Sequence, residues 1–154
     1  MALFREVRLQ ALRESPDAFG STYESAVQRD PQSWEEQLGS TTSGVDRNTQ
    51  LAFAEEQCIG LAALYREPAA PSGDLIMMWV DPRYRGTRAA SLLVAQLLAW
   101  AKESGFSSVS LDVTDSNTRA IRFYENQGFH ETGEKVEIDA ARDLSGVRMT
   151  QELG

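Results

Sequence analysis

The stretch that decides the fold is Val80-Asp81-Pro82-Arg83-Tyr84-Arg85-Gly86-Thr87-Arg88-Ala89-Ala90. The apolar run Leu75 to Val80 leads into it, and the longest apolar helical pattern, Ala89 to Glu103, follows it. We therefore predict a central strand, buried on both faces, joined by a turn to a deeply packed helix. At such a junction, unpaired backbone N–H groups and the positive end of the helix dipole point to one place.

The composition of this turn makes it a candidate anion site. The small residues that let an anion approach the backbone closely are Gly86, Ala89 and Ala90. Positive charge comes from Arg83, Arg85 and Arg88, with no acid among them. Phosphate or pyrophosphate is the expected ligand, although an arginine-rich turn before a helix is also a common solvated surface. The sequence has neither a Gly-Lys-Ser/Thr phosphate loop nor a Gly-x-Gly-x-x-Gly dinucleotide fingerprint.

Upstream of this region, the N-terminal third is predicted to be helical. Leu3 to Ala11 has helical spacing that ends before Pro16, because the residue before a proline avoids helical geometry. A second apolar stripe comprises Phe19, Tyr23, Ala26 and Val27. Asp30-Pro31 is expected to open a short third turn. Residues 39–50, rich in Ser, Thr and Gly, are predicted to be a loop.

The rest of the chain alternates predicted strands with helices. The further strands are expected over residues 51–55, 58–66, 108–114, 129–138 and 146–152. A second helix is predicted over Asn117 to Gln127, with Asn117 as its N-cap and Gly128 as its end. This order predicts a single domain, residues 1–154, whose mixed α/β sheet has one parallel strand–helix–strand crossover at its centre.

Composition excludes several classes of protein. Hydrophobic residues make up 42% and charged residues 25%, as in an ordinary globular domain. No run approaches the roughly 20 apolar residues of a membrane span, and the first residues are too charged for a secretory segment. The single cysteine, Cys58, allows no internal disulfide, so a cytoplasmic location is expected. The net charge of −8 disfavours nucleic acid and anionic membranes as partners and suits a cationic substrate.

A second motif, downstream of this turn, helps to interpret it. It runs Asn117-Thr118-Arg119-Ala120-Ile121-Arg122-Phe123-Tyr124-Glu125-Asn126-Gln127-Gly128-Phe129. With the Val-x-Pro and Arg-x-x-Gly pattern of the first stretch, it resembles the GNAT superfamily of N-acetyltransferases. The firm match covers residues 75–130. A weaker one, over 11–22, is similar to the helix pair that covers the acceptor site in a bacterial branch of that family.

The resemblance implies a fold, an activity and a set of contacts. The fold is a mixed, mostly antiparallel α+β sheet with helices on both faces, and acetyl-CoA is the co-substrate. The activity is direct acetyl transfer, in a ternary complex, to a primary amine on a small cationic molecule or a protein. The cofactor-binding residues implied are Met78, Val80, Arg83, Arg85, Gly86, Thr87, Arg88, Ala89, Ala90, Asn117 and Tyr124. Acceptor contacts are expected from Phe19, Tyr23 and Glu24.

Two residues are predicted to carry the chemistry. Tyr124 is the expected general acid, because a phenol with an ordinary pKa near 10 can protonate the leaving thiolate. Asp74 matches the position where some members of the family carry a glutamate base. A turn role for Asp74 is an equal alternative. The other candidates for the base are Glu24, Glu55, Asp112 and a chain of water molecules.

The sequence also departs from the family pattern. Arg88 stands where the second small residue is usual, and the strand that normally precedes the first helix is missing. A catalytically silent acyl-CoA-binding or regulatory module is therefore the alternative function. The missing strand would leave a sheet edge that is truncated or covered by a partner chain, and a homodimer is an open alternative. No metal site is expected, since His130, Cys58, Met77 and Met78 lack metal-ligand spacing.

Overall fold

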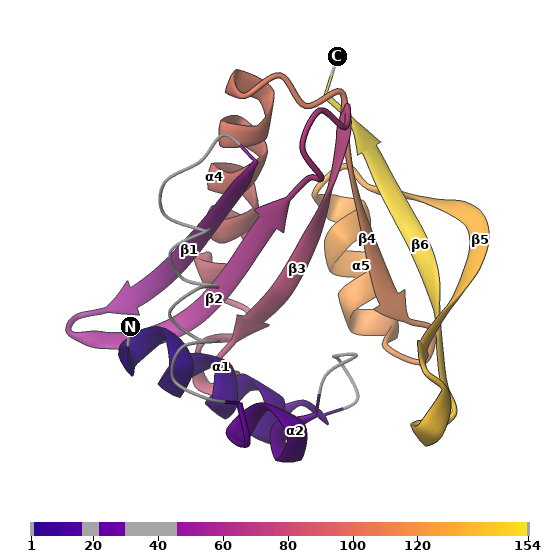
Figure 1. Ribbon diagram of the computed structural model, residues 1–154. Helices are drawn as coiled ribbons and strands as arrows, with labels where there is room; N and C mark the ends of the chain where they lie inside the picture. Colours follow the sequence, from indigo (N-terminus) through magenta and orange to yellow (C-terminus); the bar gives the residue numbers. More distant parts are fainter. Residues whose placement is uncertain (1, 17–21, 30–45, 154) are drawn as a thin grey trace.

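The computed structural model describes residues 2–16, 22–29 and 46–153 (Figure 1). In chain order its elements are α1 (Ala2–Glu14), α2 (Tyr23–Val27), β1 (Arg47–Ala54), β2 (Gln57–Tyr65), β3 (Ser72–Val80), η2 (Pro82–Tyr84), α4 (Ala89–Glu103), β4 (Ser108–Thr114), α5 (Thr118–Asn126), β5 (His130–Asp139), η3 (Ala140–Arg142) and β6 (Leu144–Glu152). None of the helices described is long and apolar enough to cross a membrane.

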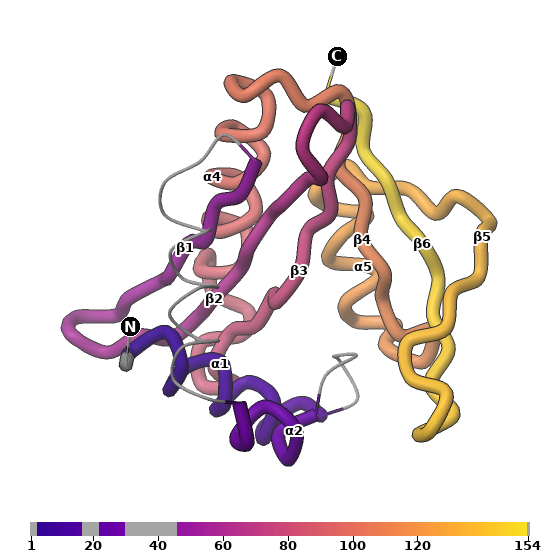
Figure 2. The backbone as a smooth tube through the Cα atoms, in the orientation of Figure 1, coloured from indigo at the N-terminus to yellow at the C-terminus, as the bar shows by residue number. Residues whose placement is uncertain are grey.

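The strands form one mixed sheet in the order β1-β2-β3-β4-β6-β5. Among the described strands, β3 and β4 alone pair in parallel, and α4 is the crossover between them. The other neighbouring strands are antiparallel, so the predicted mixed, mostly antiparallel sheet with a central parallel pair is confirmed. The tube in Figure 2 shows β3 and β4 separating along their length, while β6 stays beside β4.

Helices cover both faces of this sheet, as predicted. Because side chains alternate along a strand, β2 sends Ala62 and Leu64 into one core and Leu61 and Ala63 into the other. The first core packs against α4 and α5, and the second packs against α1 and α2. Strand β3 also contributes to both cores, which agrees with the prediction of a strand buried on both faces.

Strand β3 carries a β-bulge that the sequence analysis did not anticipate. Ile76 and Met77 face the same core, and Met77 has a φ of 57°. Ala63 pairs with Ile76 and Leu61 pairs with Trp79, so two β3 residues stand opposite one of β2. A bulge bends the strand that carries it. The parallel pairing with β4 ends just before this bend, at Asp74 and Ser110.

Several N-terminal expectations change or fall outside the description. Within the predicted loop 39–50, residues 47–50 belong to β1, because they pair with β2. The rest of that loop up to residue 45, the third turn and Phe19 lie outside the described residues. Helix α1 agrees with prediction. The second helix begins only at Tyr23, and its Val27 is 39% exposed rather than buried in a stripe.

Candidate functional site

Two adjacent cavities open where β3 and β4 separate. The first, of about 530 Å³, extends from the end of β3 to the start of α4 and along α5. The second, of about 670 Å³, lies between β3 and β4 and reaches β5 and β6. The residues that line both are Met78, Thr114, Asn117, Ala120 and Tyr124. The first cavity therefore brings together residues from both sequence motifs, and residues of the second motif lie at the junction of the two cavities.

The turn between β3 and α4 is built by its own short hydrogen bonds. Asp81 accepts a bond from the backbone N–H of Arg83 at 2.9 Å, which starts the η2 turn. Gly86 has a φ of 84° and lines the first cavity, and a Cβ there would meet nothing within 4 Å. The Thr87 hydroxyl accepts a bond from the N–H of Ala89, and Arg88 makes no side-chain cap. Helix α4 thus starts beside open space, as an anion site requires.

The three arginines of the turn differ in their partners, which corrects the expectation of unopposed charge. The Arg83 guanidinium binds the carboxylate of Asp81, a nearly buried residue, at 2.9 Å. Hydrogen bonding from Arg83 lowers the pKa of Asp81 below its ordinary value. Arg85 binds Glu14 at 2.7 Å and donates to the carbonyl of Val80 at 3.0 Å. Within the described residues, Arg88 alone of these three has no ion pair.

Glu14, at the end of α1, connects that helix to the site. Its carboxylate accepts hydrogen bonds from Arg85 and from the indole N–H of Trp79 at 2.9 Å, and also from Ser15. Burial alone would raise the pKa of Glu14, but the bonds from Ser15, Trp79 and Arg85 outweigh it and lower that pKa. Sequence analysis missed this residue, because no local pattern links Glu14 to partners 65 and 71 positions away.

Beyond Asp74, the main chain of β3 has no strand partner on the β4 side among the residues that the structure describes. This is the edge from which Met78 and Val80 were predicted to pair with the pantetheine arm. Val80 pairs with Gly60 of β2 on the opposite side. Its carbonyl accepts the bond from Arg85, so a ligand that paired there would have to replace that guanidinium.

Asn117 caps helix α5 as predicted. Its side-chain oxygen accepts a bond from the N–H of Ala120 at 3.2 Å, and the residue lines both cavities. Because the cap uses only Oδ1, the two N–H donors of the side-chain amide have no partner in the part of the chain that the structure describes. A cap and a ligand contact are therefore compatible in one residue.

Tyr124 lies on α5 at the boundary of the two cavities and is 9% exposed. Its ring packs edge-to-face against Phe123 and Phe129, with centroid distances of 5.3 and 5.9 Å. Burial raises the pKa of the Tyr124 hydroxyl above its ordinary value. The phenol therefore keeps its proton at neutral pH, as a general acid must.

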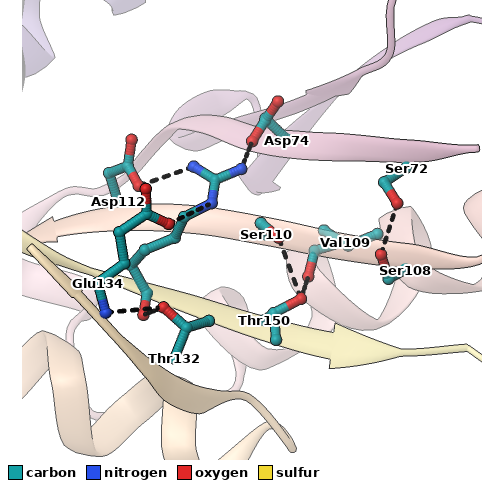
Figure 3. A network of polar contacts seen from close by, with 10 residues as sticks. Ser72, Asp74, Ser108, Val109, Ser110, Asp112, Thr132, Glu134 and Thr150 are labelled. Atoms are coloured by element: carbon teal, nitrogen blue, oxygen red, sulfur yellow. Dashed lines mark hydrogen bonds and ion pairs between the residues drawn. The ribbon is translucent and has the colours of Figure 1, made fainter. Parts of the chain in front are cut away.

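Charged residues line part of the second cavity, and Figure 3 shows two of them, Asp74 and Asp112, in their network of polar contacts. Asp74, the predicted base, and Asp112, an alternative, both bind Arg148, at 2.9 and 3.0 Å. Arg148 is the second residue that sequence analysis missed. The two remaining carboxylate candidates, Glu24 on α2 and Glu55 beside the β1–β2 turn, line neither cavity.

The predicted acceptor residues are not assembled at the described cavities. Tyr23 lines neither cavity, and its hydroxyl accepts a bond from Arg13 at 2.7 Å. Phe19 lies outside the described residues, so these contacts, with Glu24, stay predictions. Cys58 is buried and donates to the Gly60 carbonyl, and burial raises the pKa of its thiol. The described residues include no cluster of His, Cys, Asp and Glu that could hold a metal ion.

The described chain is a mixed sheet that separates at its central parallel pair, with two cavities where these strands part. The model of the acetyltransferase (GNAT) family matches residues 9–129. The chain belongs to this family, and the resemblance noted from the two motifs is confirmed.

Similar proteins agree with this assignment. A mycothiol acetyltransferase of Brachybacterium faecium is 30% identical over 138 residues, which are 87% of this chain but 39% of that protein. A GNAT acetyltransferase structure from Streptococcus pneumoniae has a TM-score of 0.73 at 22% identity, covering 83% of this chain and 79% of that one. A Bacillus anthracis chain assigned to the streptothricin acetyltransferases, solved with acetyl coenzyme A, has a TM-score of 0.65 at 22% identity, covering 74% and 66%. The chain thus spans well under two thirds of the mycothiol enzyme.

Proposed function

We propose that this chain transfers the acetyl group of acetyl-CoA to a primary amine, on a small cationic molecule or a protein, by direct attack in a ternary complex. The observation that carries the proposal is the junction of two cavities at Tyr124 and Asn117. One cavity reaches the turn at Gly86 that is predicted to bind an anion, and the other reaches the carboxylates of Asp74 and Asp112. A donor and an acceptor entering from the two cavities would meet beside the phenol.

The first cavity suits acetyl-CoA. The backbone N–H groups of residues 85–90 and the Arg88 side chain would hold the pyrophosphate, with Thr87 shaping the turn. The edge of β3 at Met78 and Val80, which faces no other described strand on the β4 side, and the side-chain amide of Asn117 would bind the pantetheine arm once the Arg85 guanidinium moves off the Val80 carbonyl. Arg83 and Arg85 would contribute mainly by holding the turn, since both are engaged by carboxylates.

Proton transfer follows from the residues at the junction. The acceptor nitrogen attacks the thioester carbon, the C–S bond breaks, and the sulfur takes the hydroxyl proton of Tyr124. A proton lost from the acceptor nitrogen after the attack restores the phenol of Tyr124. The acceptor must also lose a proton before it attacks, because an amine with an ordinary pKa near 10.4 is mostly ammonium at neutral pH. Asp74 would accept that proton, directly or through water, and Asp112 is the neighbouring alternative.

An acceptor cation suits the charge of the protein. The net charge is −8, and the second cavity is lined by three acidic residues, Asp74, Asp112 and Glu137, against two arginines, Arg8 and Arg148. Phe19, Tyr23 and Glu24 remain predicted acceptor contacts. A single domain, a cytoplasmic location and a homodimer also remain predictions.

A silent acyl-CoA-binding or regulatory module is the second candidate. Arg88 at the usual small position favours it, and so does the bond that Arg85 makes to the Val80 carbonyl. Under this alternative the chain would bind acetyl-CoA without turnover.

The test begins with calorimetric titration of acetyl-CoA and CoA into the wild-type chain and Gly86→Glu. This variant places a negative side chain at a positive φ beside the predicted pyrophosphate, so we expect binding to be lost. Free-CoA release is then followed with a panel of primary amines. Release with any amine supports the transferase, whereas binding without release across the panel supports the silent module and refutes the proposed function.

A further inference from the structure

Strands β3 and β4 form a fork, because they are paired at one end, the closed end, and separate toward the other. The two strands pair in parallel only from Ser72 to Asp74 on β3 and from Ser108 to Ser110 on β4. Beyond these residues β3 bends at its bulge, and the second cavity occupies the space between the strands. The closed end of the fork therefore fixes where the inner wall of that cavity begins.

Polar residues occupy one face of the sheet at this end. Val109, Leu111 and Val113 point into the core beneath α4 and α5, so Ser108, Ser110 and Asp112 point to the other face. Ser72 and Ser108 share a hydrogen bond of 2.7 Å, and Ser110 donates to Thr150 at 3.0 Å (Figure 3). Asp74 lies on this same face, two positions after Ser72.

Asp74 and Asp112 thus place two like charges on neighbouring strands where the fork begins to open. Arg148 of β6 lies directly opposite Asp112 in the antiparallel register, and its side chain reaches across β4 to β3. Nη2 binds Oδ1 of Asp74 at 2.9 Å, and Nη1 binds Oδ1 of Asp112 at 3.0 Å. One guanidinium therefore bridges both arms of the fork.

The bridge leaves part of each carboxylate available. Among the described residues, Oδ2 of Asp74 and Oδ2 of Asp112 have no hydrogen-bond partner, and both residues line the second cavity. Glu134 of β5 approaches Nε of Arg148 at 4.0 Å, so three carboxylates surround one cation (Figure 3). Burial opposes the charge of Arg148, but Asp112 and Asp74 outweigh it and raise the pKa of Arg148.

We propose that Arg148 is a positioning residue of the acetyl transfer: it holds Asp74 and Asp112 by Oδ1 across the fork and so directs their Oδ2 atoms at the acceptor amine. The inference rests on the proposed function. A planar guanidinium suits this role, because its N–H donors lie in one plane and can bind two carboxylates in fixed directions. The bridge has little value as a stabilising device, since pairs with side chains 30 to 40% exposed contribute about 1 kcal/mol or less.

The experiment compares Arg148→Met and Arg148→Lys with the wild-type chain. Steady-state rates are measured with butylamine, putrescine and an alanyl peptide as acceptors, and acetyl-CoA affinity is measured by calorimetry. We expect Arg148→Met to lower kcat by about tenfold or more for whichever probe the wild type uses. The acetyl-CoA Kd should stay within about twofold, because the anion-binding turn lies at the other end of β3. Arg148→Lys should recover only part of the rate, since an ammonium is a point charge.

Two further variants separate positioning from folding. Arg66→Met removes a guanidinium–carboxylate pair, to Asp46 at 3.0 Å, that lies outside both cavities. Arg66→Met should lower the free energy of unfolding without changing kcat or KM. In Arg148→Met the carboxylates of Asp74 and Asp112 repel each other, and this repulsion could unfold the protein. The double variant Asp112→Asn with Arg148→Met removes the repulsion, so the test can still be made if Arg148→Met does not fold. This double variant should fold, bind acetyl-CoA and remain slow.

The outcomes are distinct. Normal kcat and KM in folded Arg148→Met, with an active wild type, would overturn the positioning role and leave the proposed function standing. Equal losses of rate and of acetyl-CoA affinity would also overturn it, because they indicate a general structural effect. Absence of turnover by the wild type and Arg66→Met with every probe would instead refute the proposed function itself.

Discussion

Replacement of Glu14 by glutamine tests how α1 is fastened to the site. The carboxylate accepts bonds from Trp79 and Arg85, and the Arg85 and Glu14 side chains are 33% and 31% exposed. Glutamine keeps an acceptor for Trp79 but loses the ion pair with Arg85. After a discount for solvent screening, we expect a loss of about 1 kcal/mol in the free energy of unfolding at pH 7. For a domain of this size that is roughly 2–4 °C in Tm.

The effect should depend on pH with a definite sign. The pKa of Glu14 is lowered in the folded chain, so its ionised form stabilises the fold. That contribution is complete above the ordinary pKa of a glutamate and is lost as pH falls through the lowered value. The difference between wild type and Glu14→Gln should therefore be largest at neutral pH and shrink as pH falls from the ordinary pKa of a glutamate through the lowered one.

Urea unfolding at several pH values measures both quantities. Glu6→Gln is the matched control, because Glu6 is an exposed residue of the same helix. Its unfolding free energy should follow that of the wild type throughout. Equal stability of Glu14→Gln and wild type at pH 7, or a gap that widens as pH falls, would refute the argument.

Three other substitutions test the site and the sheet. Tyr124→Phe keeps the ring packing and removes the proton donor, so kcat should fall about tenfold or more with acetyl-CoA affinity unchanged by calorimetry; full activity would exclude the phenol. Asn117→Ala should cost about 1 kcal/mol in urea unfolding through the lost cap, and weaken acetyl-CoA binding. Asn117→Asp should restore only the stability; restored affinity would argue against the amide contact. Gly73→Ala should lower the unfolding free energy by about 1–3 kcal/mol, because its Cβ would lie 2.4 Å from the ring of Phe106; an unchanged denaturation midpoint would contradict this.

The arginines of the turn illustrate how far local sequence can mislead. Arg83 and Arg85 were expected to offer charge to an anion, yet Asp81 and Glu14 bind them. Asp81 lies two positions from Arg83, so that pair could have been anticipated from the sequence. The Arg85–Glu14 pair could not, because the two residues are 71 positions apart and meet only when α1 packs beside the end of β3.

Elements with local signals could be predicted from the amino-acid sequence. The spacing of apolar residues placed α4, strict alternation placed β4, and a side-chain cap placed the start of α5 at Asn117. These signals act within a few residues, where hydrogen-bonding geometry and side-chain periodicity repeat. The two motifs that resemble the family, residues 80–90 and 117–129, lie at the starts of α4 and α5.

The separation of β3 from β4, and the bridge between them, follow from contacts between segments that are far apart in the sequence. The bulge at Met77, the end of parallel pairing at Asp74, and the bridge from Arg148 each depend on which strands become neighbours. Arg148 and Asp74 are 74 positions apart, and neither has a sequence signature that names the other. The register of β6 on β4 sets that contact, and the register is fixed by packing of the whole sheet rather than by any segment alone.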